Sequence, residues 1–258
     1  MEFTVHLADA LKVVLVLLRV SSLFAVLPVF GLKSVPAKFK IVAGAALSLV
    51  VASGIPAGGD LVVRSDFHLA YLAVREVAIG LSLGFVASFI FSTVEFGGEI
   101  IGTQMGFAIA NIYDPITERQ MSVISNFQQA LFILLFFAVN GHHILFGAIF
   151  RSCEVLPIGG GGLDFLAVRE VLRLGGNIFS IAVQIASPAI IMLLLTHLAI
   201  GVISRTVPQM NVFIISFPLT ISVGVFMLAI TVPAFVTMLQ TLVGSLARDL
   251  AVVIKAFA

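Results

Sequence analysis

Apolar residues run through the chain in long stretches, and short breaks with Gly, Pro or charged residues separate them. A helix needs about 20 mainly apolar residues to cross the ~30 Å hydrocarbon core of a bilayer. The pattern therefore predicts an all-α membrane-type protein with about six apolar helical segments, arranged as helical hairpins. We expect these segments at Ala10–Phe30, Phe39–Ala57, Phe67–Val94, Ser122–Val139 with Ile144–Phe150, Asn177–Ser204 and Asn211–Val236, followed by an amphipathic helix at Thr237–Ala258.

Several of these segments contain signals for a break. Asn140-Gly141 is a helix-end and turn signal, so the fourth segment should consist of two pieces. Pro188 in the fifth segment, and Pro218 and Pro233 in the sixth, predict kinked or broken helices. The carbonyl groups that such prolines leave free must find donors elsewhere in the protein or in water.

The longest interruption of the apolar pattern is Glu95–Asn126, with the sequence EFGGEIIGTQMGFAIANIYDPITERQMSVISN. In its first half Gly98, Gly102 and Gly106 recur at every fourth residue. On a helix these glycines form one stripe, along which another backbone can approach closely. We therefore expect them to serve helix packing.

In the second half of this stretch the helical periodicity fails, and small apolar residues lead to an Asp-Pro pair that starts a turn or a helix. Loops longer than about 12–15 residues are often functional. A segment with an apolar tip between two membrane-type helices is a candidate gate or plug, and a plain connection is the alternative. The candidate plug residues are Gly106, Phe107, Ala108, Ile109, Ala110, Asn111, Ile112, Tyr113, Asp114 and Pro115.

Five charged residues lie in or beside the apolar segments, where a charge is costly unless it is paired or hydrated. Arg19 stands near the middle of the first segment and should face protein. Arg75 and Glu76 are adjacent, about 100° apart on a helix, and should need separate partners. Arg75 either snorkels to a membrane interface or pairs with another helix or subunit. With Glu95 and Glu99, which should serve packing or a pore mouth, they form a predicted set of buried charges.

Composition sets the class of protein. The chain is 60% hydrophobic and only 10% charged, with a mean hydropathy of +1.19, against about 25% charged residues in soluble domains. Its net charge of +1 provides no basic footprint for nucleic acid, so no nucleic-acid partner is expected. Trp is absent, and Lys and Arg are nearly balanced between alternate connections, so that charge gives no orientation in a membrane. Such a chain is expected to bury apolar faces against partner subunits.

No residue pattern predicts catalysis, a metal or a cofactor. Cys153 is the single cysteine and is expected to be an inert buried thiol. His142 and His143 are neighbours that point apart on a helix and lack a zinc-type set of further ligands. The polar, Gly-rich stretch from Arg151 to Gly176 lacks the Gly-Lys-Ser/Thr ending of a phosphate-binding loop, and is expected to be a connection with a short helical patch.

Four motifs carry a family resemblance: PVFGLKSVPAKFK, GEIIGTQMGFAIANIYDP, FAVNGHHILF and RTVPQMNVFIISFPLTISVG, in this order. With them the chain resembles the FliR family of flagellar type III export-apparatus proteins along essentially its whole length. The resemblance implies an export gate built with FliP and FliQ homologues, together with FlhB and FlhA homologues, in the bacterial inner membrane at the flagellar basal body. Unfolded flagellar proteins would pass through its pore.

The resemblance also implies a division of the chain, with a FliP-like part at about residues 1–176 and a FliQ-like part at 177–258. It places the plug loop from Gly106 to about Met121, and it implies no catalytic residue and no cofactor. A secondary transporter or channel of small solutes is the alternative, although no pair of broken segments recurs at matching places in two halves. A membrane enzyme is a third class, without a nucleophile and base to support it.

Overall fold

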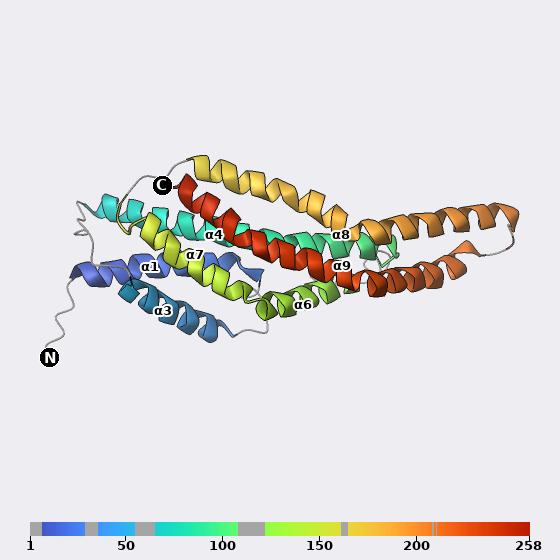
Figure 1. Ribbon diagram of the computed structural model, residues 1–258, viewed down its shortest axis with the longest axis horizontal. Helices are drawn as coiled ribbons and strands as arrows, with labels where there is room; N and C mark the ends of the chain where they lie inside the picture. The colour runs from blue at the N-terminus through green and yellow to red at the C-terminus, as the bar shows by residue number, and fades with distance from the viewer. Residues whose placement is uncertain are drawn as a thin grey trace. The chain divides into compact units, whose positions relative to one another are not determined.

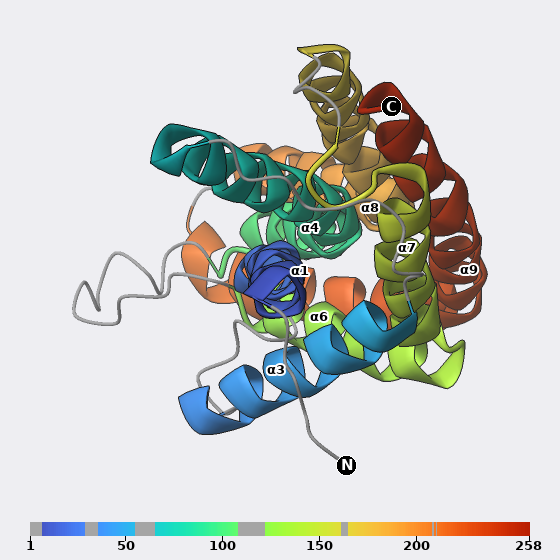
Figure 2. The ribbon, with the colours of Figure 1, turned by 90° about the vertical axis from the view of Figure 1, so that its left-hand side faces the viewer.

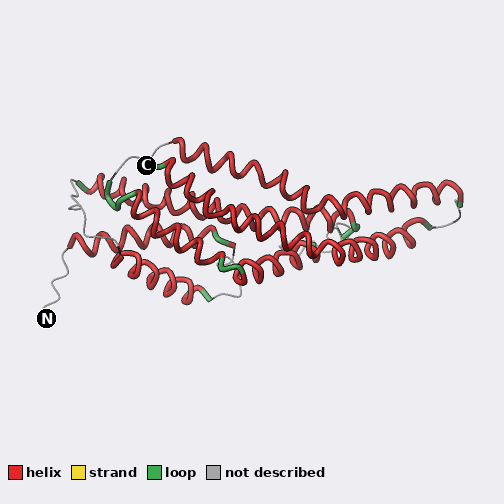
Figure 3. The backbone as a smooth tube through the Cα atoms, in the orientation of Figure 1, coloured by secondary structure: helices red, strands yellow, loops and turns green. Residues whose placement is uncertain are grey.

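The computed structural model describes residues 7–28, 36–54, 65–107, 122–160, 165–207, 209 and 211–258. Within these residues the chain forms helices and no strand (Figure 3). The prediction of an all-α protein is confirmed. The helices, labelled in Figure 1, are α1 Leu7–Val26, α3 Ala37–Gly54, α4 Asp66–Gln104, α6 Val123–Ala138, α7 Gly141–Val155, α8 Phe165–Thr206 and α9 Val212–Ala256.

Three of the described helices, α4, α8 and α9, are long and apolar enough to cross a membrane. The pair α6 and α7 adds a fourth candidate if it counts as one span, because the two helices meet at a bend of 65°. Asn140, between them, has a left-handed backbone with φ 59°, a conformation that Asn tolerates better than most residues. The predicted break at Asn140-Gly141 is confirmed.

The prolines were expected to kink or break their helices, and they do not break them. Helices α8 and α9 continue through Pro188, Pro218 and Pro233. Pro188 has no N–H and therefore leaves the carbonyl of Gln184 without its helical donor. The hydroxyl of Ser187 donates to that carbonyl at 2.9 Å. A side chain thus replaces the missing backbone donor in α8.

Three helices extend beyond the predicted segments. Helix α4 continues past Val94 to Gln104, so that the glycine stripe is helical up to Gly102. Helix α8 begins at Phe165, inside the expected connection. Its first turns alternate apolar and charged residues at the spacing of an amphipathic helix, so the stretch lacks the continuous apolar run by which the segments were predicted. Helix α9 joins the sixth segment and the amphipathic tail into one helix of 45 residues.

The contacts divide the chain into two compact units. Unit 1 comprises residues 1–89, 140–175 and 244–258, and unit 2 comprises residues 90–139 and 176–243. Both units therefore draw on segments far apart in the sequence. The expected division into a FliP-like part at 1–176 and a FliQ-like part at 177–258 concerns family likeness and stays a prediction; its boundary lies inside α8.

In unit 1, helix α1 lies between α3 and α4, as the view in Figure 2 shows. Two glycines of α4 allow the backbones of α1 and α4 to approach closely. A Cβ atom at Gly80 would lie 2.1 Å from the carbonyl oxygen of Arg19, and one at Gly84 would lie 2.9 Å from that of Leu23. Side chains at these positions would force the two helices apart.

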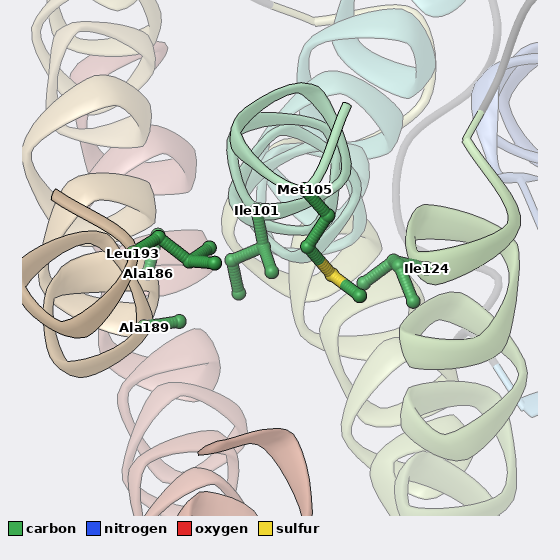
Figure 4. Close-up of a cluster of buried hydrophobic side chains, with 6 residues drawn as sticks. All are labelled: Ile101, Met105, Ile124, Ala186, Ala189 and Leu193. Atoms are coloured by element: carbon green, nitrogen blue, oxygen red, sulfur yellow. The ribbon is translucent and has the colours of Figure 1, made fainter. Parts of the chain in front are cut away.

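In unit 2 the core contains an aromatic group and an aliphatic cluster. The ring of Phe91 in α4 packs edge-to-face on Phe132 and Phe136 in α6, with centroid distances of 4.7 and 5.3 Å. The aliphatic cluster joins α4, α6 and α8, and in Figure 4 Met105 points toward Ile124 while Ile101 points toward the residues of α8. Its buried members are Ile101, Met105, Ile124, Ala186, Ala189 and Leu193.

Candidate functional site

The candidate site consists of the residues at the two ends of segment 108–121, where α4 ends and α6 begins. All of it belongs to unit 2. Of the candidate plug residues, Gly106 and Phe107 are described, and Ala108, Ile109, Ala110, Asn111, Ile112, Tyr113, Asp114 and Pro115 lie outside the described residues. The geometry that follows therefore concerns the two ends of the segment.

Helix α4 ends in a turn that only glycine adopts easily. The backbone N–H of Gly106 donates to the carbonyl of Thr103 at 3.0 Å, and that of Phe107 donates to Gly102 at 3.1 Å. Gly106 has φ +93°, on the positive side where a Cβ atom would strain the backbone. These two bonds and the positive φ form a Schellman motif, which stops the helix and turns the chain away from its axis.

Ser122 fixes the other end of the segment. Its hydroxyl caps α6 by accepting from the N–H of Ser125 at 3.1 Å, the capping interaction that serines favour. Its own N–H donates to the carboxylate of Glu99 in α4 at 2.9 Å. The hydroxyl of Ser125 donates to the carbonyl of Glu95 at 2.8 Å. The start of α6 is therefore hydrogen-bonded to the last turns of α4.

The glycine stripe of α4 lies where these contacts form. A Cβ atom at Gly98 would lie 2.6 Å from the Cα atom of Ser125, and one at Gly102 would lie 2.3 Å from the hydroxyl of Ser122. Because the carbonyl of Gly102 also accepts from Phe107, both ends of segment 108–121 meet at Gly102. Phe107 and Ser122, the two residues that flank segment 108–121, therefore lie beside the same glycine.

Helix α9 contacts the first of these ends. The hydroxyl of Thr220 donates to the carbonyl of Met105 at 3.1 Å. A Cβ atom at Gly224 would lie 2.6 Å from the sulfur of Met105, and one at Gly106 would lie 3.0 Å from the ring of Phe217. The sequence prediction missed Thr220 and Gly224 as site residues. Their only signal was the spacing of Phe217, Thr220 and Gly224 by three and four positions, which places them on one face of a helix.

A second polar centre lies in unit 1, around Arg19. The guanidinium of Arg19 donates to the carboxylate of Glu76 at 2.5 Å, to the hydroxyl of Ser152 at 3.2 Å and to the carbonyl of Leu156 at 3.1 Å. The Arg75 guanidinium donates to Glu76 at 3.2 Å and to the carbonyl of a proline after α7 at 3.3 Å. Arg19, Arg75 and Glu76 are all buried. One carboxylate thus faces two guanidinium groups inside the protein.

Two expectations about the charges need correction, and one of the two alternatives for Arg75 is excluded. Arg75 and Glu76 do not have wholly separate partners, because the long Arg75 side chain turns back to its neighbour. Arg75 is 1% exposed, so it does not snorkel to an interface. Glu95 and Glu99 are half-buried and not buried, because both lie at the edge of the contact between α4 and α6.

The remaining candidate groups carry no recognisable chemistry. In the part of the chain that the structure describes, no three His, Cys, Asp or Glu side chains gather as a metal site would require. The rings of His142 and His143 lie 4.2 Å apart, centroid to centroid, at the start of α7. Cys153 is a buried thiol beside Arg19.

Sequence comparison finds known relatives over most of this chain. A family model described as bacterial export proteins, family 1, matches residues 10–246. The flagellar biosynthetic protein FliR of Escherichia coli (strain K12) is 36% identical over 239 residues, which cover 93% of this chain and 91% of that protein. The proteins of the same name in Bacillus subtilis (strain 168) and Aquifex aeolicus (strain VF5) are 34% and 27% identical, over 84% and 83% of this chain.

Proposed function

This chain belongs to the bacterial export proteins, family 1, and on that premise we propose that it is a non-enzymatic pore subunit of the flagellar protein export gate. Family membership supports a role in flagellar export in a membrane. In our proposal the chain lies in the bacterial inner membrane at the flagellar basal body. It assembles there with FliP and FliQ homologues, contacts FlhB and FlhA homologues, and lets unfolded flagellar proteins pass.

One observation carries the proposed closing role: both ends of segment 108–121 are fixed next to Gly102. Schellman and N-cap motifs hold the two ends, so the segment can be displaced without unfolding α4 or α6. Its first residues, Ala108, Ile109 and Ala110, are small or apolar. Apolar residues of this kind close a pore by filling it and excluding water. We therefore assign the segment as the plug of the gate.

The exposed apolar faces of α8 and α9 support assembly with other subunits. Among the described residues, Leu172 and Val202 of α8 are 71% and 65% exposed, and Ile214 of α9 is 70% exposed. Exposed apolar surface of this extent marks a contact with lipid or with another protein. In the proposed gate, FliP and FliQ homologues cover most of it and the membrane covers the rest.

The test is a deletion of Ala108–Tyr113 in the complex co-purified with its partners. Phe107 is retained because it packs against the aliphatic cluster of unit 2. The remaining residues 114–121 extend to about 26 Å at most, which is ample for two ends that meet at one glycine. A deletion of the same length in the connection between α3 and α4, Pro56–Leu61, is the matched control.

The measurement is ion conductance and small-solute uptake across membranes that contain equal amounts of assembled complex. We expect the deletion of Ala108–Tyr113 to make the closed complex leaky, and the control deletion to leave it tight. If both deleted complexes assemble and are equally tight, segment 108–121 is a plain connector and the closing role is wrong.

A further inference from the structure

We propose that one face of α9, made of Phe217, Thr220 and Gly224, positions Met105 and Gly106, the residues at which α4 ends and the proposed plug segment begins. We call these three residues the α9 anchor face. The inference rests on the proposed function, because it names the residues that hold the plug's first end in place. It adds a specific dependence: the end of α4 is held in place by contacts from α9.

The hydrogen bond from Thr220 to Met105 is the first element of the anchor face. The last carbonyl groups of a helix have no donor within the helix, and Met105 follows directly on the end of α4. The hydroxyl of Thr220, which is buried, lies 3.1 Å from this carbonyl, 115 residues away in the sequence, and 3.2 Å from the carbonyl of Phe217 in its own helix. Its single proton is shared between these two acceptors, of which Met105 is the nearer. Helix α9 therefore supplies a donor that α4 lacks.

Packing around Met105 and Gly106 is the second element. The Met105 side chain is fully buried and lies against Gly224, where the absence of a side chain makes room for it. In Figure 4 the Met105 side chain points toward Ile124 at the start of α6. The ring of Phe217 covers Gly106, the residue with positive φ at which the chain turns. Each residue of the α9 anchor face thus contacts Met105 or Gly106, the two residues that follow directly on α4.

The two ends of the plug segment differ in what holds them. Ser122, at the second end, is hydrogen-bonded to α4 through the carboxylate of Glu99 and the carbonyl of Gly98. The first end is bonded to α9 through Thr220. A shift of α9 relative to α4 would therefore loosen the first end and leave the second in place.

The test uses hydrogen exchange of the Met105–Phe107 amides in the complete co-purified complex. In Thr220→Val the side chain keeps its shape but loses the hydroxyl, and we expect these amides to exchange about fivefold faster, the factor that one net hydrogen bond provides. Thr220→Ser keeps the hydroxyl and should restore the slow exchange. Thr231→Val is the matched control, because the hydroxyl of Thr231 bonds only within α9, to Met227 and Leu228.

A pair of glycine variants tests the packing independently. In Gly224→Ala the new Cβ atom would lie 2.5 Å from Cγ of Met105 and would push that side chain away, whereas a Cβ atom at Gly244 of the same helix meets nothing within 4 Å. We expect Gly224→Ala to accelerate exchange at Met105–Phe107 and Gly244→Ala to leave it unchanged. If Thr220→Val fails to assemble, this pair of variants still tests the α9 anchor face.

Faster exchange at Met105–Phe107 in Thr220→Val, reversed in Thr220→Ser, supports the anchor face. If solute leakage rises with it, the proposed plug is supported as well. If leakage does not change, the anchor face still holds α4 and the plug assignment fails. If Thr220→Val and Gly224→Ala exchange at the rates of Thr231→Val and Gly244→Ala, the anchor face is wrong.

Discussion

Helix α4 and the C-terminal helices α8 and α9 are about equally apolar, but they differ in how much of their apolar surface is buried within the chain. The most apolar stretch of α4 is 61% buried within the chain, whereas those of α8 and α9 are only 22% and 11% buried. Helix α4 also carries the buried charges Arg75 and Glu76 and the glycines that admit α1 and α6. Among the described glycines of α8 and α9, Gly175 and Gly224 have other parts of the chain within 4 Å of an added Cβ atom, whereas Gly176, Gly201 and Gly244 have none.

This difference separates two kinds of apolar helix that hydropathy alone does not distinguish. Helix α4 contributes to the core of its own chain, and most residues of its most apolar stretch are buried there. Helices α8 and α9 keep large apolar side chains at their surface, including Leu198 and Phe226, which are 60% and 63% exposed. Such faces require surroundings outside the chain, which in our account are the partner subunits and the lipid.

The largest expected effect comes from the charged centre beside α4. Glu76→Leu would leave the guanidinium groups of Arg19 and Arg75 buried without a carboxylate, and we expect a loss of about 3–5 kcal/mol in stability. The measurement is thermal unfolding of the purified complex. Glu170→Leu is the control, because the side chains of Arg173 and Glu170 are 59% and 29% exposed, and ion pairs open to solvent contribute at most about 1 kcal/mol. Equal melting temperatures for the two variants would contradict a buried charged centre.

Truncating one leucine in each kind of helix tests the comparison directly. Leu83 of α4 is 0% exposed and Leu195 of α8 is 54% exposed. We expect Leu83→Ala to cost about 2–5 kcal/mol in stability of the chain, and Leu195→Ala to change it by less than about 0.5 kcal/mol. Leu195→Ala should instead weaken co-purification with the partners. If both variants destabilise the chain equally, the distinction between the two kinds of helix is wrong.

A glycine pair provides the smallest effect. In Gly98→Ala of α4 the new Cβ atom would lie 2.6 Å from the backbone of Ser125, whereas at Gly176 of α8 it would meet nothing within 4 Å. We expect Gly98→Ala to destabilise the protein by about 1–3 kcal/mol through overpacking. Gly176→Ala should stabilise it slightly, by at most about 1 kcal/mol, because Ala is the better helix former. A melting temperature that rises in Gly98→Ala as it does in Gly176→Ala would show that Gly98 faces open space.

Local patterns predicted most of the helices, because their signals lie within a few residues of each other. The Asn140-Gly141 break is an example, since it depends only on the turn preference of two adjacent residues. A short helical patch at Arg169 and Glu170 was predicted, but its continuity with the fifth segment in one helix from Phe165 was missed, because the charged residues made the stretch look like a polar connection. Mean hydropathy reflects only the composition of a stretch, whereas an amphipathic helix is recognised by the spacing of its apolar residues.

Contacts between distant residues could not be predicted from one sequence. Arg19 was recognised as a charge that needs protein around it, but its partners Glu76 and Ser152 lie 57 and 133 residues away. The glycine stripe indicated a close approach without naming Ser122, Ser125 or Phe217 as the neighbours. Local spacing indicates which face of a helix is special, and only the fold determines what lies against it.

The mass of the particle that this chain forms tests the central claim, that α8 and α9 are covered by partner subunits in an export gate. The measurement is native mass spectrometry of the chain purified in mild detergent from cells that express it with its FliP and FliQ homologues. We predict a hetero-oligomer that contains all three proteins, and aggregation when the chain is expressed alone. A stable monodisperse monomer, formed equally well with and without the partners, would contradict the account.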